Sequence, residues 1–403
     1  MADGAYAKYG VPEIVNGVGY ATRVGGSCPH PDVLRAMSEA NTAFVEIDDL
    51  EAAASRMIAH CTGAESGLAT CGASAALTLA AAACLAGSDP ELMDLLPDVS
   101  TFTRSEIIYP HPGPYDYDHA VRTAGARLVT IDYEAPNALE QIRSSIGPHT
   151  AAIGYVWLGT NESPAIPALA ELAHGHGLPL IVDAAFSLPP VENLRSFITR
   201  GADLVAYSGG KHLGGPQNSG ILCGRADLLR SAWVQMVDMD VRPDTWSLQP
   251  LIESGWIERP PRHGIGRSMK VGKDAVIGLM AALERYSVRN HDTELEVWRS
   301  SIACVADGLA GLPELGLTQL FPNPNGQPFP VLRIASGEDA DRLCVRDLIL
   351  ALGRLPRKVI LAEHERSPDV AFLYPMCLRP GDPEYIVTSI RTIIEKKNQG
   401  ELP

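Results

Sequence analysis

The sequence predicts an α/β protein with a large domain built on a mostly parallel β-sheet and a smaller α+β domain at its C-terminal end. Three observations predict this class. Between about residues 60 and 225, short apolar segments alternate with amphipathic segments of helical length. The apolar segments are hydrophobic on both sides, as in parallel strands covered by helices. The 403 residues, 46% hydrophobic and 20% charged, suffice for two or three compact domains.

Each element of the large domain is expected from a local pattern. Strands are expected at 107–109, 127–131, 152–157, 180–183, 204–207 and 221–224, the last a candidate for antiparallel pairing. Helices are expected at 73–86, 118–124, 138–146, 166–174 and 193–199, and residues 226–290 read as helical with a break at Pro260-Pro261.

Beyond about residue 295 the pattern changes to a long helix, a strand at 329–334, a helix at 345–352, a strand pair at 359–361 and 371–374, and a terminal helix. The expected organisation is therefore an N-terminal segment (1–45) that packs with the small domain, a large domain (46–290) and a small C-terminal domain (291–403).

The candidate chemistry is concentrated between Asp203 and Gly220, where Lys211 lies in a glycine-rich turn after an apolar strand. Glycines leave little bulk around the Lys211 amine, so a flat ligand could approach it. Asp183 ends the preceding apolar strand. A lysine able to form a Schiff base and a carboxylate able to face a pyridinium nitrogen are what pyridoxal 5'-phosphate (PLP) requires. Ligands of parallel sheets bind beyond the carboxyl ends of the strands, where Asp183 and Lys211 are expected. This position favours a PLP-binding lysine over an ordinary lysine on a surface loop.

A phosphate site is expected at Gly72, Ala73 and Ser74, directly before the alanine-rich helix. The N–H groups and the dipole at a helix N-terminus attract anions, although Ser74 also suits an ordinary helix cap. Ser208, three residues before Lys211, offers a hydroxyl to the same phosphate.

Three further residues are candidates for contact with the cofactor ring or the substrate. His111, in a proline-rich turn, could stack on the ring, and Tyr115 in the same turn could contact the substrate. Asn161 follows a strand end and could bind the ring hydroxyl, or simply form a turn.

Substrate carboxylates are usually bound by arginine, because its fork matches two oxygens. Arg379, before the last helix, and Arg23, in a glycine-rich N-terminal segment, are the candidates, each with a surface role as the alternative. Arg267 belongs to a cluster of three cations before a helix, where binding of an anion explains the positive charge better than a solvated helix start does.

Composition argues against several other classes of function. The net charge of −15, without a basic run, argues against nucleic acid as a partner. No signal peptide is expected, and the longest apolar run, 73–86, is shorter than the ~20 residues that a bilayer requires. The eight cysteines lack a C-x-x-C pair, and His174 and His176 lack zinc-ligand spacing. We therefore expect a cytoplasmic protein with reduced thiols, no metal and no membrane association.

Several motifs resemble the fold-type I (aspartate-aminotransferase-like) PLP enzymes. They are Asp183-Ala-Ala-Phe-Ser-Leu-Pro-Pro190, Gly201-Ala-Asp-Leu-Val-Ala-Tyr-Ser-Gly-Gly-Lys211, Gly214-Gly-Pro-Gln217 and Met269-Lys-Val-Gly-Lys273. The resemblance is to the selenocysteine-synthase-like branch, which includes D-glucosaminate-6-phosphate ammonia-lyases, and covers about residues 12–290. It implies a seven-stranded sheet, Lys211 as the Schiff-base lysine and Asp183 as the pyridinium partner. It also implies a homodimer or higher homo-oligomer, in which the segment from Arg267 to Lys273 reaches a neighbouring subunit's phosphate.

The expected activity is a PLP-dependent lyase reaction on a small-molecule amino acid or amino sugar acid. Lys211 would remove the α-proton, Asp183 would support the ring, and His212 or Tyr115 would assist a departing β-hydroxyl, giving a 2-oxo acid and ammonia. A PLP-dependent racemase, epimerase or aldolase is the alternative on the same residues. Further alternatives are a selenium transferase acting on tRNA and a PLP-binding protein without turnover.

Overall fold

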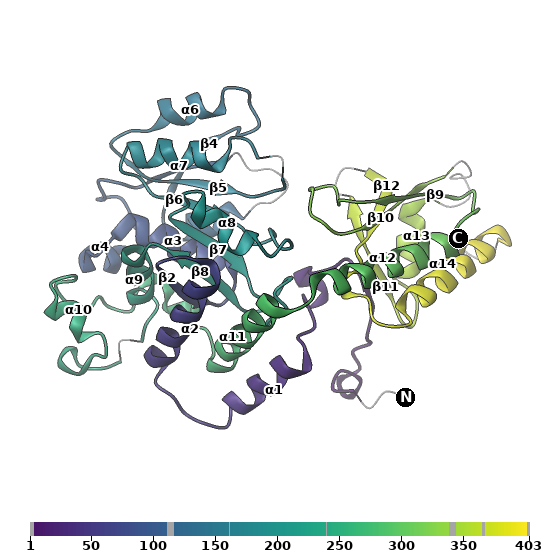
Figure 1. Ribbon diagram of the computed structural model, residues 1–403, viewed down its shortest axis with the longest axis horizontal. Coiled ribbons are helices and arrows are strands. Elements are labelled where there is room, and N and C mark those ends of the chain that lie inside the picture. The colour runs from purple at the N-terminus through teal and green to yellow at the C-terminus, as the bar shows by residue number, and fades with distance from the viewer. Residues whose placement is uncertain are drawn as a thin grey trace. The chain divides into compact units, whose positions relative to one another are not determined.

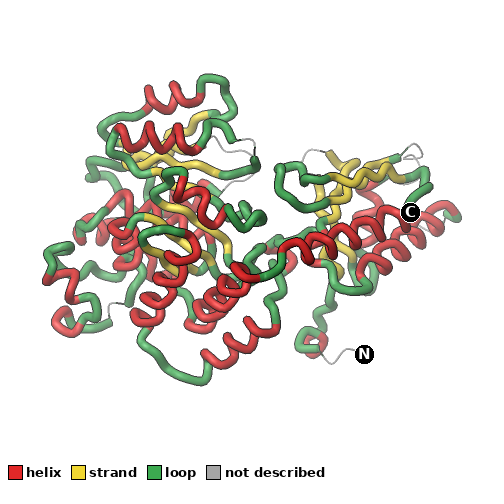
Figure 2. Tube along the Cα trace, viewed as in Figure 1, coloured by secondary structure: helices red, strands yellow, loops and turns green. Residues whose placement is uncertain are grey.

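The structure, a computed structural model, describes residues 4–110, 117–160, 162–238, 240–337, 344–364 and 367–400. The chain folds as two compact units (Figures 1 and 2). The large unit comprises residues 29–288, and the small unit joins residues 1–28 to residues 289–403.

The large unit is built on the predicted seven-stranded, mostly parallel sheet, with strand order β2-β8-β7-β6-β5-β3-β4. The strands are β2 (Ser66–Thr70), β3 (Glu106–Pro110), β4 (Arg127–Ile131), β5 (Thr150–Val156), β6 (Leu180–Asp183), β7 (Leu204–Ser208) and β8 (Gly220–Gly224). Strands β3 to β7 pair in parallel, whereas β8 is antiparallel to both of its neighbours. The expectation that β8 is antiparallel is therefore confirmed.

Helices cover both faces of this sheet, which is why its strands are apolar on both sides. Ile181 and Leu204 face one core with α3, and the alternating Val182 and Val205 face the other core with α7. The first face is covered by α3 (Ala73–Ala86), α4 (Pro90–Leu95), α5 (Asp118–Thr123) and α9 (Ala226–Val234). The second is covered by α2 (Ile47–Thr62), α6 (Ala138–Ser145), α7 (Ile166–Gly175), α8 (Asn193–Thr199) and α11 (Lys273–Val288).

The large unit differs from the sequence expectation in several places, and helices α2 and α4 and strand β2 lie where no element was expected. Helix α1 (Pro31–Ala40) occupies a stretch without strong periodicity, and packs along α11 because Gly278 leaves room for Met37. The stretch after α9 is less helical than expected. Between α9 and α11 it contains only short helical turns in its described residues, namely η3 (Pro243–Thr245), α10 (Gln249–Glu253) and η4 (Ile265–Met269).

The small unit contains a five-stranded sheet with strand order β1-β11-β12-β10-β9. The N-terminal strand β1 pairs in parallel with β11, and the other pairs are antiparallel. Its strands are β1 (Val15–Gly17), β9 (Leu315–Leu320), β10 (Val331–Ser336), β11 (Val359–His364) and β12 (Ser367–Leu373). Its helices are α12 (His291–Gly308), α13 (Val345–Leu352), α14 (Asp382–Asn398) and the turns η1 (Ala7–Tyr9), η2 (Thr22–Val24) and η5 (Pro375–Cys377).

The three long helices of the small unit pack on one face of its sheet, where Ile302, Leu348 and Ile390 share a core with the strands. Within the described ranges of either unit, no helix has both the length and the apolar character that crossing a bilayer demands.

Candidate active site

The site is assembled at the edge of the large sheet where β2, β6 and β7 end. Register places Thr70, Gly220 and Ser208 side by side across β2, β8 and β7. Asp183, the last residue of β6, pairs with Ala206 of β7. Because Asp183 and Ser208 lie an even number of residues after Ile181 and Leu204, both face the side of the sheet that α3 covers. This edge therefore brings together two of the predicted cofactor residues.

The N-terminus of α3 lies directly over this edge. A Cβ on Gly220 would stand 2.4 Å from the carbonyl carbon of Gly72 and 2.7 Å from the nitrogen of Ala73. Gly72 adopts a φ of 125°, which strongly favours glycine. The two glycines thus allow the backbone at the start of α3, a 14-residue helix, to approach Gly220, which pairs with Ser208 across β8 and β7. Gly72, Ala73 and Ser208 are thereby brought together at the N-terminus of α3, an end of a helix that attracts anions.

The glycines around Lys211 are required by a tight return of the chain. A Cβ on Gly210 would lie 2.4 Å from the Cα of Gln217, and Gly215 N donates to Gly209 O at 2.9 Å. The turn holds Lys211 half-buried, with its Nζ 5.3 Å from the centre of the Phe186 ring. Phe186 follows β6 by three residues, so the Lys211 amine lies near the end of the strand that carries Asp183.

Burial and mutual attraction act in opposite directions on Asp183 and Lys211. Asp183 is 7% exposed, and burial raises the pKa of its carboxyl, while the Ala185 N–H at 3.0 Å and the charge of Lys211 lower it. Burial lowers the pKa of the Lys211 amine, and the charge of Asp183 opposes that effect. A pair of titratable groups that influence each other in a largely buried site is typical of catalytic centres.

His212 is buried at 2% exposure, and its ring meets the edge of the Tyr286 ring at 5.5 Å. Tyr286 belongs to α11 and to the core on the face opposite α3. The structure therefore places His212 toward α11, and Asp183 and Ser208 toward α3.

One residue near Asp183 was absent from the predicted set. Tyr109 ends the apolar part of β3, is 4% exposed, and faces the same core as Ile181. Burial raises the pKa of its hydroxyl well above the ordinary value, and the negative charge of Asp183 raises it further. The sequence signal for Tyr109 was a polar atom at the end of a buried strand, in the register that faces α3.

The two arginines predicted to bind a carboxylate belong to the small unit. Arg23 donates to the Leu361 carbonyl at 3.3 Å. Arg379 donates to Glu13 at 3.4 Å and to the Cys28 sulfur at 3.5 Å. Both are held by partners of their own unit, and their assignment to the substrate remains a prediction.

Arg267 lies in the large unit and pairs with Asp238 at 2.7 Å. Its turn packs on α3, since a Cβ on Gly266 would stand 2.6 Å from Leu79. The remaining predicted residues, His111, Tyr115 and Asn161, lie outside the described residues.

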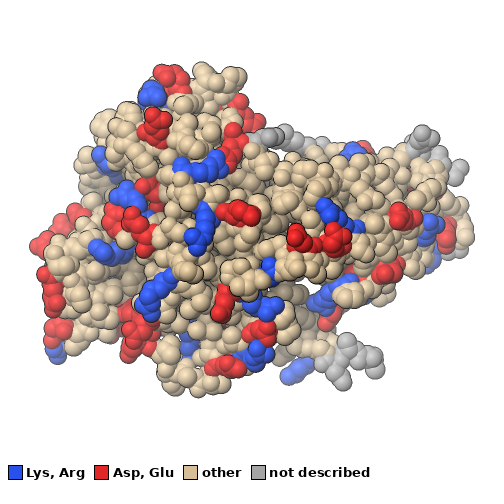
Figure 3. Space-filling model, viewed as in Figure 1, with Lys and Arg blue, Asp and Glu red and all other residues tan. Residues whose placement is uncertain are grey.

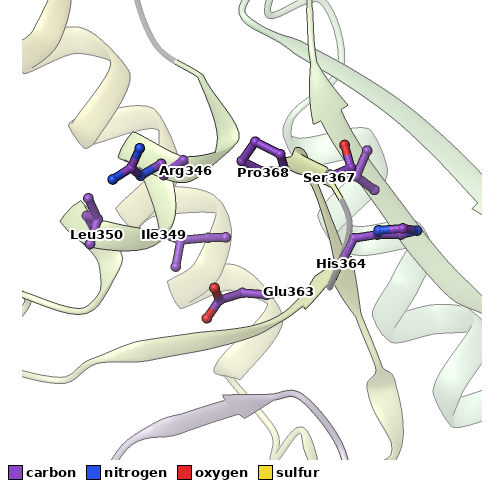
Figure 4. Close-up of a pocket in the computed structure, with 8 residues that line it drawn as sticks. Arg346, Ile349, Leu350, Glu363, His364, Ser367 and Pro368 are labelled. Atoms are coloured by element: carbon purple, nitrogen blue, oxygen red, sulfur yellow. The ribbon is translucent and has the colours of Figure 1, made fainter. Parts of the chain in front are cut away.

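A separate groove of about 460 Å³ lies in the small unit between α13, β11 and β12 (Figure 4). Arg346, Glu363 and His364 supply its charged or titratable side chains, and all three are exposed. It contains none of the predicted site residues.

The fold and the site together define a fold-type I enzyme that uses PLP. The fit to this cofactor is seen in the cradle at Gly220 and Gly72, which a single Cβ would fill, and in the buried Asp183 beside the Lys211 amine. A solved structure titled D-glucosaminate-6-phosphate ammonia-lyase matches with a TM-score of 0.80 and 26% identity, covering 99% of this chain and 100% of that one.

The chain belongs to the SelA family, whose model, described as L-seryl-tRNA selenium transferase, matches residues 49–254. D-glucosaminate-6-phosphate ammonia lyase of Salmonella typhimurium is 27% identical over 98% of this chain and 99% of its own length. The 5'-C-glycyluridine monooxygenase-decarboxylase of a Streptomyces species is 31% identical over 70% of this chain and 65% of its own length.

Proposed function

We propose that this protein is a PLP-dependent ammonia-lyase that converts a β-hydroxy amino acid or amino sugar acid into a 2-oxo acid and ammonia. The observation that carries the proposal is the half-buried Lys211 and the buried Asp183, which affect each other's pKa, together with the glycine cradle at Gly220 and Gly72, on a chain similar from end to end to an ammonia-lyase.

When bound, PLP supplies an electron sink for the bonds at the substrate's Cα. Asp183 is suited to hold the proton on the ring nitrogen, because a carboxylate there stabilises the positive charge of a pyridinium. Gly72, Ala73, Ser74 and Ser208 would hold the phosphate. Lys211 would first anchor the cofactor and then, displaced by the substrate's amino group, act as the base, since burial favours its neutral amine.

The proposed reaction balances without an oxidant or a reductant. The α-proton passes to Lys211 Nζ, the Cβ–O bond breaks, and the hydroxyl leaves as water after protonation. Addition of one water to the released enamine then frees ammonium and leaves the 2-oxo acid. Of the two acids expected from the sequence, His212 is buried against Tyr286, which suits it to holding the Lys211 turn more than to reaching a leaving group.

The negative net charge of this protein favours a small-molecule substrate over an aminoacylated tRNA. The net charge is −15, and on the face drawn in Figure 3 acidic and basic side chains are interspersed. Binding of a nucleic acid backbone calls for clustered lysines and arginines. We also propose that the protein is cytoplasmic and that it forms a homodimer or a larger homo-oligomer. Sedimentation of the purified protein would test the oligomeric state.

The test begins with the visible spectrum of the protein supplied with PLP, before and after borohydride. We expect the reductant to fix the cofactor on Lys211, as peptide mass spectrometry would report. Pools of β-hydroxy amino acids and amino sugar acids are then assayed for three products. Ammonia with a 2-oxo acid supports the lyase, inversion alone indicates a racemase or epimerase, and a released aldehyde indicates an aldolase.

Replacement of the anchoring lysine is the decisive variant. Lys211→Ala should lose turnover by several orders of magnitude, because anchor and base are removed together. Lys396→Ala makes the same change at an exposed lysine of α14 and should leave turnover unchanged. Turnover retained in Lys211→Ala would sink the proposal.

A further inference from the structure

The hydroxyl of Tyr109 is buried and has no hydrogen-bond partner among the described residues. Its side chain is 4% exposed, and the hydroxyl oxygen itself is inaccessible to solvent. Leaving a buried hydroxyl unpaired costs free energy, so folded proteins rarely retain one without a use for it. Phenylalanine would fill the same space without that cost, which points to a partner that meets this oxygen in the working enzyme.

The ring of Tyr109 is directed across the sheet toward Asp183. A Cβ on Gly154 of the neighbouring strand β5 would stand 2.3 Å from the Tyr109 Cδ2 atom, so the ring lies directly over that glycine. The strand beyond β5 is β6, which ends at Asp183. Strands β3 and β6 are two strand spacings apart, about 10 Å. A tyrosine that crosses the first spacing presents its hydroxyl to the second, on the face where Asp183 stands.

The charged residues around Tyr109 indicate which group could accept a hydrogen bond from its hydroxyl. The negative charge of Asp183 acts on the Tyr109 hydroxyl, and so does that of Asp118 on α5. Asp118 already accepts from the Arg122 Nε at 2.7 Å, and Tyr133 lies on the opposite face of β5. Among the described residues, the Lys211 amine also acts on the charge of Asp183. A phenol that remains protonated between two carboxylates can only be a hydrogen-bond donor to them.

We propose that Tyr109 is a positioning residue for Asp183, and that its hydroxyl, unpaired among the described residues of the cofactor-free chain, donates a hydrogen bond to the Asp183 carboxylate once PLP is bound. One carboxylate oxygen, Oδ1, accepts from Ala185 N at 3.0 Å. A second donor from the β3 side fixes the plane of the carboxylate and favours its ionised form. The inference rests on the proposed role of Asp183 as the partner of the cofactor's ring nitrogen.

Four proteins test the inference: wild type, Tyr109→Phe, Tyr133→Phe and Asp183→Asn. Tyr133→Phe is the matched control, because its buried hydroxyl donates to the Gly154 carbonyl at 2.8 Å and lies on the other face of the sheet. For each protein the thermal midpoint is measured without cofactor, and the dissociation constant of PLP is obtained by titrating the cofactor-free protein.

The two phenylalanine variants should behave oppositely. Tyr109→Phe should melt at or above the wild-type temperature without cofactor, because no hydrogen bond is lost, and should bind PLP about tenfold more weakly. Tyr133→Phe should melt lower without cofactor, because a buried hydrogen bond is lost, and should bind PLP as wild type does.

The remaining outcomes separate this inference from the proposed function. PLP binding by Tyr109→Phe within about twofold of wild type, while Asp183→Asn binds at least tenfold more weakly, would overturn the role of Tyr109 and leave that of Asp183 standing. Wild-type PLP binding by Asp183→Asn would overturn both. A cofactor-free Tyr109→Phe that melts as low as Tyr133→Phe would assign the hydroxyl a purely structural role and would also overturn the inference.

Discussion

Substitution of Glu51 by glutamine should stabilise the protein, and by an amount that grows with pH. Glu51 lies on α2 at 3% exposure, and its Oε2 accepts from the backbone N–H of Ala69 on the edge strand β2 at 3.1 Å. Its Oε1 has no hydrogen-bond partner within the described parts of the chain. Burial raises the pKa of this carboxyl to about 8, the Ala69 N–H opposes the rise, and Asp48 adds to it.

The direction and the size of this change in the free energy of unfolding follow from the proton that Glu51 keeps in the folded state. Between pH 4.5, the ordinary pKa, and pH 8 the folded chain holds this proton while the unfolded chain has lost it. The unfolded state therefore binds fewer protons, and the contribution of Glu51 to stability falls as pH rises through this window and levels off above pH 8. At about 1.4 kcal/mol per pH unit, the loss reaches about 3 kcal/mol at pH 7 and about 5 kcal/mol above pH 8.

Glutamine retains an oxygen for the Ala69 N–H and carries no titrating proton. Urea unfolding of cofactor-free wild type and Glu51→Gln at pH 5, 6, 7, 8 and 9 measures the difference, which should widen by about 1.4 kcal/mol per unit up to pH 8. Glu171→Gln, at an exposed position of α7, should show no such widening. A difference that stays flat from pH 5 to pH 8 would show that the folded protein does not retain the proton.

Two glycine substitutions test the packing on either side of the site. Gly220→Ala places a Cβ 2.4 Å from the backbone of Gly72 and should weaken PLP binding at least about tenfold in a titration of the cofactor-free protein. Gly147→Ala, where a Cβ meets nothing within 4 Å, should bind PLP normally, and equal binding by both would contradict the phosphate assignment. Gly154→Ala drives a Cβ into the Tyr109 ring and should cost about 1–3 kcal/mol in urea unfolding, whereas an unchanged midpoint would refute the close approach.

Many strands of the large sheet and many helices that cover it could be predicted, because each has a clear hydrophobic pattern over a short stretch of sequence. The boundaries 127–131, 180–183 and 193–199 agree with β4, β6 and α8, since each is a compact apolar or amphipathic segment bounded by turn residues. Helices α1, α2 and α4 and strands β1, β2 and β9 escaped prediction. Helix α1 and strand β9 bury only one residue each, and β1 and β2 are short strands held by pairing with the distant β11 and β8.

By itself the sequence predicted the fold class and the cofactor, and it identified Lys211 and Asp183 as candidate residues of the site. It could do so because strand periodicity and glycine-rich turns are local properties of the chain. The tertiary structure alone decided which side chains share a face. Register across β7 and β8 brings Ser208 to the cradle formed by Gly220 and Gly72. The absence of a side chain at Gly154 lets Tyr109 reach across β5, and the burial of Glu51, which extends from α2 to the β2 backbone, raises the pKa of its carboxyl. These relations depend on distances between segments far apart in the sequence, which no local pattern encodes.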